Sequence, residues 1–313
     1  MIRYESENGK LPSSVVLGIG VFDGVHLGHR RIISEVADLA RKTGAMPVAV
    51  TFFPHPREVL CPDSPPRLLL PPDERLRRLR EAGAAGIGII DFSAAIAVTA
   101  PEDFLSRILA AGVPQVRGIC VGAHWRFGKN GAGDTRFLGT ELARRQVAFT
   151  AVPELEIDGG VVSSSAIRDA VAGGDLDRAE RMMGAPVCLY GEVEPGCRIA
   201  TAILETPTAN LHVDYGVLPP DGVYATWGEV DGRRCPAITN IGVSPTFEQN
   251  GGVRRVETHL LGFSGDLYRR QMKIELKKKL RDEVRFSSPA DLKRQIAADR
   301  AQALQILTAG GAK

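Results

Sequence analysis

The chain has 313 residues, of which 44% are hydrophobic and 24% are charged, and its formal net charge is +2. This length predicts two domains, and the composition is typical of a soluble globular protein. So small a net charge, with no apolar run long enough to span a bilayer, argues against nucleic acid and membranes as partners. The polar first ten residues contain no signal-peptide core, and five scattered cysteines are interpreted as reduced thiols of a cytoplasmic protein. The oligomeric state is left open.

The first motif joins a predicted strand to a predicted helix. An apolar run at residues 15–21 precedes it, and apolar residues at helical spacing follow over residues 32–40. Between them lies a glycine-rich turn with His26 and His29, whose rings can face one ligand. Small residues let a ligand approach the backbone, and the N–H groups of a helix start favour an anion. We interpret residues 18–31 as a phosphate site, although their spacing matches neither common phosphate loop. The alternative is an ordinary turn with two surface histidines.

The rest of the first half alternates predicted strands and helices. The strands span residues 47–53, 86–91, 116–121 and 147–152, and the helices span 73–82, 101–111 and 135–145. This alternation predicts an α/β fold with a doubly wound parallel sheet, in which ligands bind beyond the carboxyl ends of the strands. Three strands run into polar or glycine-rich turns there, at Phe22-Asp23-Gly24, at Phe53-Pro54-His55-Pro56 and at residues 122–134.

Two later segments of this half also suit a nucleotide. The loop at residues 122–134 is small and basic, and the alternative is a mobile surface loop. Serines at residues 163–165 start a predicted helix that runs to about Ala172 and holds Arg168 one turn inside. Hydroxyls and an arginine at a helix start can clamp phosphates, and a plain helix cap is the alternative.

From residue 187 onward the predicted strands are short and lie between turns. They cover residues 187–193, 203–204, 222–230, 234–241, 254–261 and 271–276. This pattern predicts a small antiparallel β-barrel, followed by a C-terminal helix from Ser288 to about Thr308. Asp299 interrupts the apolar face of that helix. We place the domain boundary after residue 185, which gives domains 1–185 and 186–313.

The whole chain resembles the prokaryotic bifunctional riboflavin kinase/FAD synthetase family. In the first half the resemblance rests on residues 20–29, 51–56, 127–129 and 163–168. In the second half it rests on residues 207–211, 218–225, 240–247, 256–260, 266–268, 280–286 and 295–296. It implies a nucleotidyltransferase domain that adenylylates FMN to FAD, followed by a barrel that phosphorylates riboflavin to FMN. ATP, riboflavin and FMN would be the substrates, and Mg2+ would be the cofactor.

The resemblance also implies roles for individual residues. His26 and His29 would stabilise the charge that moves onto the leaving pyrophosphate, while the FMN phosphate attacks in line. Glu257 would take the proton from the riboflavin 5′-hydroxyl, although a strand-face carboxylate is the alternative for it, and Thr208 and Asn210 would bind Mg2+ and the ATP phosphates. The nucleotide-binding residues would be Gly20, Phe22, Asp23, Gly24, Gly28, His124, Ser164, Ser165 and Arg168. The flavin-binding residues would be Phe53, His55, Pro56, Arg57 and Phe127.

The chain departs from the family's usual pattern at several places, among them Pro195-Gly196, where the family usually has His-Gly, and Arg269, where it usually has glycine. His124 stands where the family usually has Asn or Asp. Before Pro-Thr-Ala-Asn, the usual Gly-Arg-x-Leu-Gly run reads Thr-Ala-Ile-Leu-Glu-Thr over residues 201–206, so an arginine is missing and Glu205 adds a carboxylate beside the expected triphosphate.

Three hypotheses remain open. The main one is a bifunctional enzyme. The second is a monofunctional FMN adenylyltransferase whose kinase-like barrel is impaired or only binds flavin. The third is a non-catalytic flavin- or nucleotide-binding regulator, against which the intact histidine and serine–arginine motifs argue.

Overall fold

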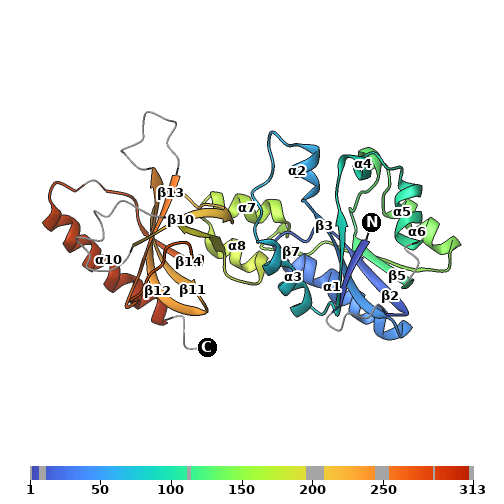
Figure 1. The fold of residues 1–313 in the computed structure, drawn as a ribbon, viewed down its shortest axis with the longest axis horizontal. Helices are drawn as coiled ribbons and strands as arrows, with labels where there is room; N and C mark the ends of the chain where they lie inside the picture. The colour runs from blue at the N-terminus through green and yellow to red at the C-terminus, as the bar shows by residue number, and fades with distance from the viewer. Residues whose placement is uncertain are drawn as a thin grey trace. The chain divides into compact units, whose positions relative to one another are not determined.

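The computed structural model describes residues 2–6, 12–110, 114–194, 208–243, 254–284 and 286–309. The chain divides into two compact units (Figure 1): residues 1–66 with 72–163, and residues 67–71 with 164–313. Among the described residues, no helix is long and apolar enough to cross a membrane. The altered run at 201–206 and the predicted strand at 203–204 lie outside the described residues.

A six-stranded sheet forms the centre of the first unit. Its strands are β1 (Ile2–Ser6), β2 (Ser14–Ile19), β3 (Met46–Phe53), β4 (Gly86–Asp91), β5 (Gln115–Gly122) and β6 (Ala148–Val152). Their order in space is β1-β4-β3-β2-β5-β6, and every neighbouring pair is parallel except β1 with β4. The predicted parallel sheet is therefore confirmed, and β1 is an edge strand that the prediction does not include. A separate hairpin consists of β7 (Glu156–Ile157) and β8 (Gly160–Val161).

Helices cover both faces of this sheet. They are α1 (Leu27–Thr43), α2 (Pro56–Leu60), α3 (Pro72–Glu81), α4 (Ala94–Ala97), α5 (Pro101–Leu109), the short η1 (Lys129–Gly131) and α6 (Thr135–Arg144). Leu17 and Ile19 of β2 share a core with residues of α5 and α6, whereas Gly18 faces α1. A Cβ atom at Gly18 would lie 2.7 Å from Cγ2 of Val36, so this glycine lets α1 lie close to the sheet. The contact places the start of α1 beside the carboxyl end of β2.

The second unit contains a closed antiparallel barrel. Its strands are β9 (Cys188–Glu194), β10 (Thr208–Tyr215), β11 (Gly222–Val230), β12 (Arg233–Val243), β13 (Arg254–Leu260) and β14 (Gln271–Arg281). Their order is β10-β13-β12-β11-β14-β9, which confirms the predicted barrel. The predicted strands omit β10, although Ala209, Leu211 and Val213 alternate with polar residues there. The Pro-Thr-Ala-Asn motif at residues 207–210 overlaps the start of β10, so Thr208 and Asn210 lie on a strand.

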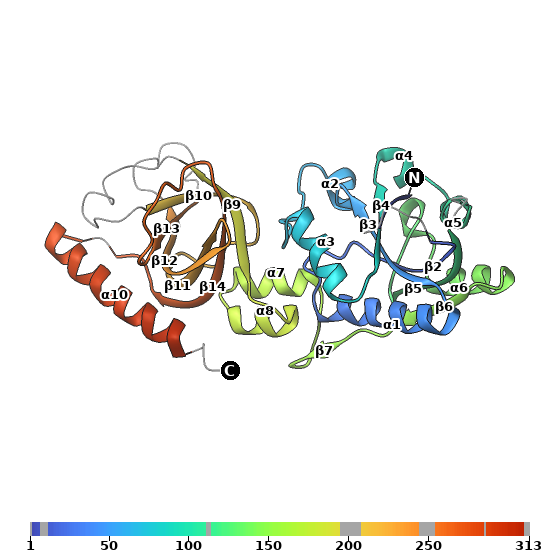
Figure 2. The same cartoon turned by 60° about the horizontal axis from the view of Figure 1, so that its bottom comes forward.

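The last helix, α10 (Pro289–Ala309), packs on β11, β12 and β14, as Figure 2 shows beside the barrel. Ala303 and Leu307 of α10 share a core with Val223, Ala225 and Ile238 of the barrel. The predicted C-terminal helix and its apolar face are therefore confirmed.

Two helices that follow the strands of the sheet in the sequence belong to the same unit as the barrel. They are α7 (Ser164–Ala172) and α8 (Leu176–Met183). The two helices pack on each other, and α8 also packs on β14, where Nζ of Lys277 lies 3.5 Å from Oε1 of Glu180. The sequence instead assigns both helices to a first domain that ends at residue 185. As the limit between two catalytic domains, residue 185 stays a prediction.

Candidate active sites

The turn after β2 lies where the strand order of the sheet reverses. β3 pairs with one side of β2 and β5 with the other, so the turn opens at a topological switch point. The backbone of Phe22 has φ 54° and that of Val25 has φ 45°, and both residues carry side chains that disfavour this left-handed region. Strained backbone of this kind concentrates at functional sites, where the surrounding structure holds it in place.

Three side chains from three elements hold this turn. The Thr51 hydroxyl of β3 donates a hydrogen bond of 2.8 Å to the carbonyl oxygen of Val21. Nη1 of Arg75, on α3, donates to the same oxygen at 3.2 Å. Nε of Arg30, on α1, donates at 3.2 Å to the carbonyl oxygen of Val25. The conformation of the turn is therefore fixed from the neighbouring strand and from two helices.

The structure brings the two predicted histidines together. His26 caps α1, because its Nδ1 accepts a hydrogen bond of 3.3 Å from the backbone N–H of His29. The two rings stack with their centroids 3.5 Å apart, and the rings of Phe22 and His29 form a T-shaped pair with centroids 5.2 Å apart. A Cβ atom at Gly28 would lie 3.2 Å from the His26 ring, so this glycine leaves the ring its room.

Electrostatics make this turn suited to an anion. Burial lowers the pKa of His29 well below its usual range, and the positive charges of His26 and Arg75 lower it further. His29 is therefore neutral at physiological pH, and its buried Nδ1 has no hydrogen-bond partner among the described residues. A bound polyphosphate would favour the protonated imidazole, because an opposite charge nearby stabilises the charged form.

The turn after β3 carries four of the five predicted flavin-binding residues. Its His55 is buried and caps α2: Nδ1 accepts a hydrogen bond of 3.1 Å from the backbone N–H of Arg57. The backbone N–H of His55 donates in turn to Oε2 of Glu58 at 3.0 Å. Phe53 is half-buried and lies under the guanidinium of Arg75, with Cζ 4.0 Å from the ring centroid. Contact of these residues with a flavin stays a prediction.

The loop after β5 holds two predicted contacts in contrasting surroundings. The side chain of His124 is 78% exposed, and its Nε2 lies 3.6 Å from Oε2 of Glu154. Phe127 is only 6% exposed and stacks on Trp125 at 4.7 Å between centroids. Phe127 therefore offers little surface to a ligand. Both roles stay predictions.

The predicted phosphate clamp belongs to the second unit. Ser164 is the first residue of α7, and Ser165 follows it. Nε of Arg168 donates a hydrogen bond of 2.8 Å to the carbonyl oxygen of Arg67 in the same unit. That these residues meet the phosphates beside His26 and His29 stays a prediction.

The second candidate site follows from the register of the barrel. Glu257 on β13 lies directly opposite Asn210 on β10 and directly opposite Asn240 on β12. Residues directly opposite on neighbouring strands point to the same face of a sheet. Thr208 lies directly opposite His259, and this pair is two residues along the same two strands from Asn210 and Glu257, so it points to the same face. The predicted base and the predicted metal ligands therefore lie side by side on one face.

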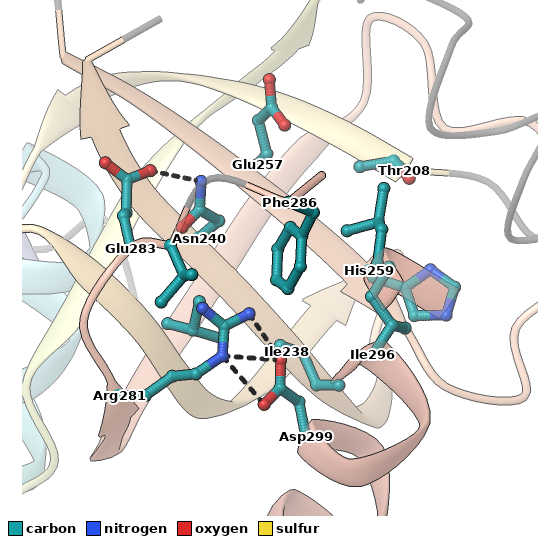
Figure 3. A pocket seen from close by; sticks show the side chains of 13 residues that line it. Thr208, Ile238, Asn240, Glu257, His259, Arg281, Glu283, Phe286, Ile296 and Asp299 are labelled. Carbon is teal, nitrogen blue, oxygen red and sulfur yellow. Dashed lines mark hydrogen bonds and ion pairs between the residues drawn. The ribbon is translucent and has the colours of Figure 1, made fainter. Parts of the chain in front are cut away.

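A pocket of about 290 Å³ opens over this face (Figure 3). Its apolar lining consists of Val223, Ile238, Val284, Phe286, Leu292 and Ile296. Its polar lining consists of Thr208, Asn240, Glu257, His259, Arg281, Glu283 and Asp299. An apolar pocket with a few convergent polar groups is typical of a site for a small organic molecule.

Hydrogen bonds order the polar end of this pocket. Nδ2 of Asn240 donates to Oε1 of Glu283 at 2.9 Å, as the dashed line in Figure 3 marks. The Glu283 carboxylate occupies the space that a Cβ at Gly242 would fill, so the glycine admits it. Oγ1 of Thr208 is buried and has no hydrogen-bond partner within the described ranges. Asn210 lies two residues further along β10 on the same face, and a hydroxyl and an amide oxygen fit the oxygen donors that Mg2+ prefers.

An ion pair joins the end of β14 to α10 beneath the pocket. Nη2 of Arg281 lies 2.8 Å from Oδ2 of Asp299, and its Nε lies 3.1 Å from both carboxylate oxygens (Figure 3). Nε2 of Gln295 also donates to Oδ1 of Asp299 at 2.9 Å. Asp299 is 3% exposed. The polar interruption of the helix is therefore the anchor that holds α10 on the barrel.

Replacing Asp299 with alanine is expected to lower the free energy of unfolding of the barrel by about 3 kcal/mol, because the partly buried guanidinium of Arg281 would lose the carboxylate that compensates its charge. Urea unfolding, followed by the fluorescence of Trp227 in a Trp125→Phe background, measures this, since Trp227 packs against the core that α10 covers. Asp282→Asn is the matched control, because water screens its exposed ion pair with Lys279 and the free energy of unfolding should stay unchanged. An Asp299→Ala protein as stable as the wild type would contradict the prediction.

Several residues of these sites were not assigned from the sequence. They are Arg75 in the first unit and Asn240, Arg281, Glu283 and Asp299 in the second. Asn240, Arg281 and Glu283 lie within recognised motifs, so a signal was present without a role attached to it. Arg75 lies on a helix that is charged along its length, so the sequence does not distinguish this buried arginine, which is 2% exposed, from its neighbours.

Comparisons with known proteins cover both units. Two family models match the chain, FAD synthetase over residues 9–166 and riboflavin kinase over residues 183–307. The bifunctional riboflavin kinase/FMN adenylyltransferase of Pseudomonas fluorescens is 37% identical over 92% of this chain and 91% of its own length. The protein of the same name from Escherichia coli K12 is 36% identical over 91% and 90%. The crystal structure of a macrolide-efflux protein from Streptococcus pneumoniae superposes with a TM-score of 0.82 at 29% identity, over 93% of this chain and 94% of that one.

Proposed function

Because the chain belongs to the bifunctional riboflavin kinase/FMN adenylyltransferase family, we propose that it converts riboflavin to FAD in two ATP-dependent steps. The barrel phosphorylates riboflavin to FMN, and the unit with the parallel sheet adenylylates FMN. The observation that carries the kinase step is the position of Glu257, between Asn210 and Asn240 at the edge of an apolar pocket. A cytoplasmic location is part of the same proposal.

In the kinase step, Glu257 acts as the general base. Its carboxylate takes the proton of the riboflavin 5′-hydroxyl, and that oxygen attacks the γ-phosphorus of ATP while ADP leaves. The apolar lining of the pocket suits the flavin ring system, and the half-buried carboxylate lies at its polar end. Thr208 and Asn210 would hold Mg2+, which supplies positive charge against the phosphates of ATP.

In the adenylylation step, a phosphate oxygen of FMN attacks the α-phosphorus of ATP. The bond from that phosphorus to the bridging oxygen breaks, and pyrophosphate leaves with the electron pair. His26 and His29 donate hydrogen bonds to the charge that develops, at the start of a helix whose N–H groups favour an anion. Ser164, Ser165 and Arg168 would hold the β- and γ-phosphates. The step needs positioning and fixed donors more than a covalent nucleophile.

A product assay tests the proposed function. Purified protein receives ATP and Mg2+ with either riboflavin or FMN, and the flavins are separated by chromatography while pyrophosphate release is measured. We expect FMN and FAD from riboflavin, and FAD with equimolar pyrophosphate from FMN. FAD from FMN with riboflavin untouched would favour the monofunctional hypothesis, which the altered run at residues 201–206 raises. No product from either flavin would contradict the proposal.

A further inference from the structure

We propose that Arg75 is a positioning residue for adenylyl transfer, which holds the turn that carries the two histidines against the turn that ends β3. The inference rests on the proposed function, because it concerns the FMN adenylyltransferase step. Arg75 is a buried cation that belongs neither to the histidine motif of residues 20–29 nor to the serine–arginine motif of residues 163–168.

The side chain of Arg75 connects two segments that are far apart in the sequence. It extends from α3, and its Nη1 donates a hydrogen bond to the carbonyl oxygen of Val21, 54 positions away. The same guanidinium lies over the ring of Phe53, with Cζ 4.0 Å from the centroid. Val21 lies between the predicted nucleotide contacts Gly20 and Phe22, and Phe53 is the first predicted flavin contact along the chain. Arg75 therefore contacts the backbone of the turn after β2 and the aromatic ring at the end of β3.

The burial of Arg75 indicates positioning and not direct contact with substrate. Arg75 is 2% exposed, so its guanidinium is covered on the faces that a ligand would need. Removing a charged group from water is costly unless it is well satisfied by partners. A planar guanidinium can meet a carbonyl oxygen with its edge and an aromatic ring with its face at once, which an ammonium cannot.

The contact with Val21 bears on the strained part of the turn. Phe22 follows Val21 and has φ 54°, and its ring forms a T-shaped pair with that of His29. Without Arg75, the carbonyl oxygen of Val21 would lose this donor and keep the Thr51 hydroxyl, at 2.8 Å. We expect the turn, no longer held from α3, to relax toward ordinary backbone angles and to carry the Phe22 and His29 rings with it. A shift of about 1 Å at reacting groups is enough to lower a rate about 100-fold.

The charge of Arg75 acts in the same direction. Together with burial and His26, it lowers the pKa of His29. The imidazole is therefore neutral before substrate binds, and the fixed guanidinium leaves a positive potential where the phosphates of ATP are expected. This electrostatic effect supports the geometric argument and would survive in a lysine variant.

The test compares Arg75→Met, Arg75→Lys and the matched control Arg78→Met in the full-length protein. Arg78 lies on the same helix and is also buried, and its Nε donates a hydrogen bond of 2.8 Å to Oε1 of Glu74 on that helix. We expect Arg75→Met to lower kcat for FAD formation from FMN about 100-fold with KM for ATP changed less than about threefold. The kcat of Arg75→Lys for FAD formation should be at least tenfold higher than that of Arg75→Met. Arg78→Met should keep kcat within threefold of the wild type.

Phosphorylation of riboflavin by the same samples serves as an internal reference, and thermal unfolding reports on the fold. If Arg75→Met does not fold, Thr51→Val carries the test, because it removes the other donor to Val21 at nearly constant volume and should lower kcat about tenfold. Folded variants of Arg75 and Thr51 with the kcat of Arg78→Met would overturn the inference and leave the proposed function standing. A wild-type protein that makes no FAD from FMN would overturn both.

Discussion

Replacing His29 with alanine is expected to abolish FAD formation from FMN, while FMN formation from riboflavin continues. The substitution removes a donor at the start of α1 and also the ring on which His26 stacks. Loss of one fixed donor to a developing oxyanion costs about 100-fold to 1000-fold in rate. Because the partner ring is released as well, we expect a loss of at least about 1000-fold. Steady-state assays with FMN and ATP, with FAD quantified by chromatography, measure it.

The controls for His29 separate chemistry from folding. His29→Asn keeps a polar side chain in the site and should be nearly as inactive, because an amide cannot gain the proton that the imidazole can. His212→Ala changes an exposed histidine on β10 and should leave FAD formation at the wild-type rate. Riboflavin phosphorylation by the His29 variants should stay unchanged. Wild-type FAD formation by His29→Ala, with FMN supplied, would remove the histidine pair from the mechanism.

Replacing Glu257 with glutamine is expected to do the reverse and abolish phosphorylation of riboflavin. The amide has the size of the carboxylate and can stay between Asn210 and Asn240, but it cannot accept the proton of the 5′-hydroxyl. A positioned general base contributes about 100-fold to 10,000-fold. We expect kcat to fall by about 1000-fold, with a smaller change in KM for riboflavin. Production of FMN and ADP measures the effect.

Glu229→Gln is the matched control for Glu257. Glu229 also lies on a barrel strand, but it is paired with Lys273 at 3.3 Å outside the pocket, so both activities should stay at the wild-type level. FAD formation from FMN by Glu257→Gln should be intact. Mixing the Glu257→Gln and His29→Ala proteins should restore FAD formation from riboflavin, because FMN released by one is the substrate of the other. Unimpaired phosphorylation by Glu257→Gln would show that another group takes the proton.

The sequence was most informative where structure depends on neighbouring residues. The strand, turn and helix around His26 follow from apolar periodicity and from glycines, which act over a few positions. The change from alternating strands and helices to short strands after residue 187 likewise predicted the barrel. The predicted strands do not include β1 and β10, although both alternate apolar and polar residues. β1 is a short strand at the edge of the sheet, and β10 begins within the Pro-Thr-Ala-Asn motif.

By itself, the sequence determined the two folds and the turn after β2, and it supplied candidate residues for the two reactions, whose roles stay predictions. The tertiary structure alone decided that Arg75 of a charged helix reaches Val21, that Asp299 is paired with Arg281, and that Asn240 lies beside Glu257. These contacts join residues that are 54, 18 and 17 positions apart and lie on different elements. Local periodicity does not predict such partners. A buried polar side chain needs a hydrogen-bond or ion-pair partner, and packing can supply that partner from a distant part of the sequence.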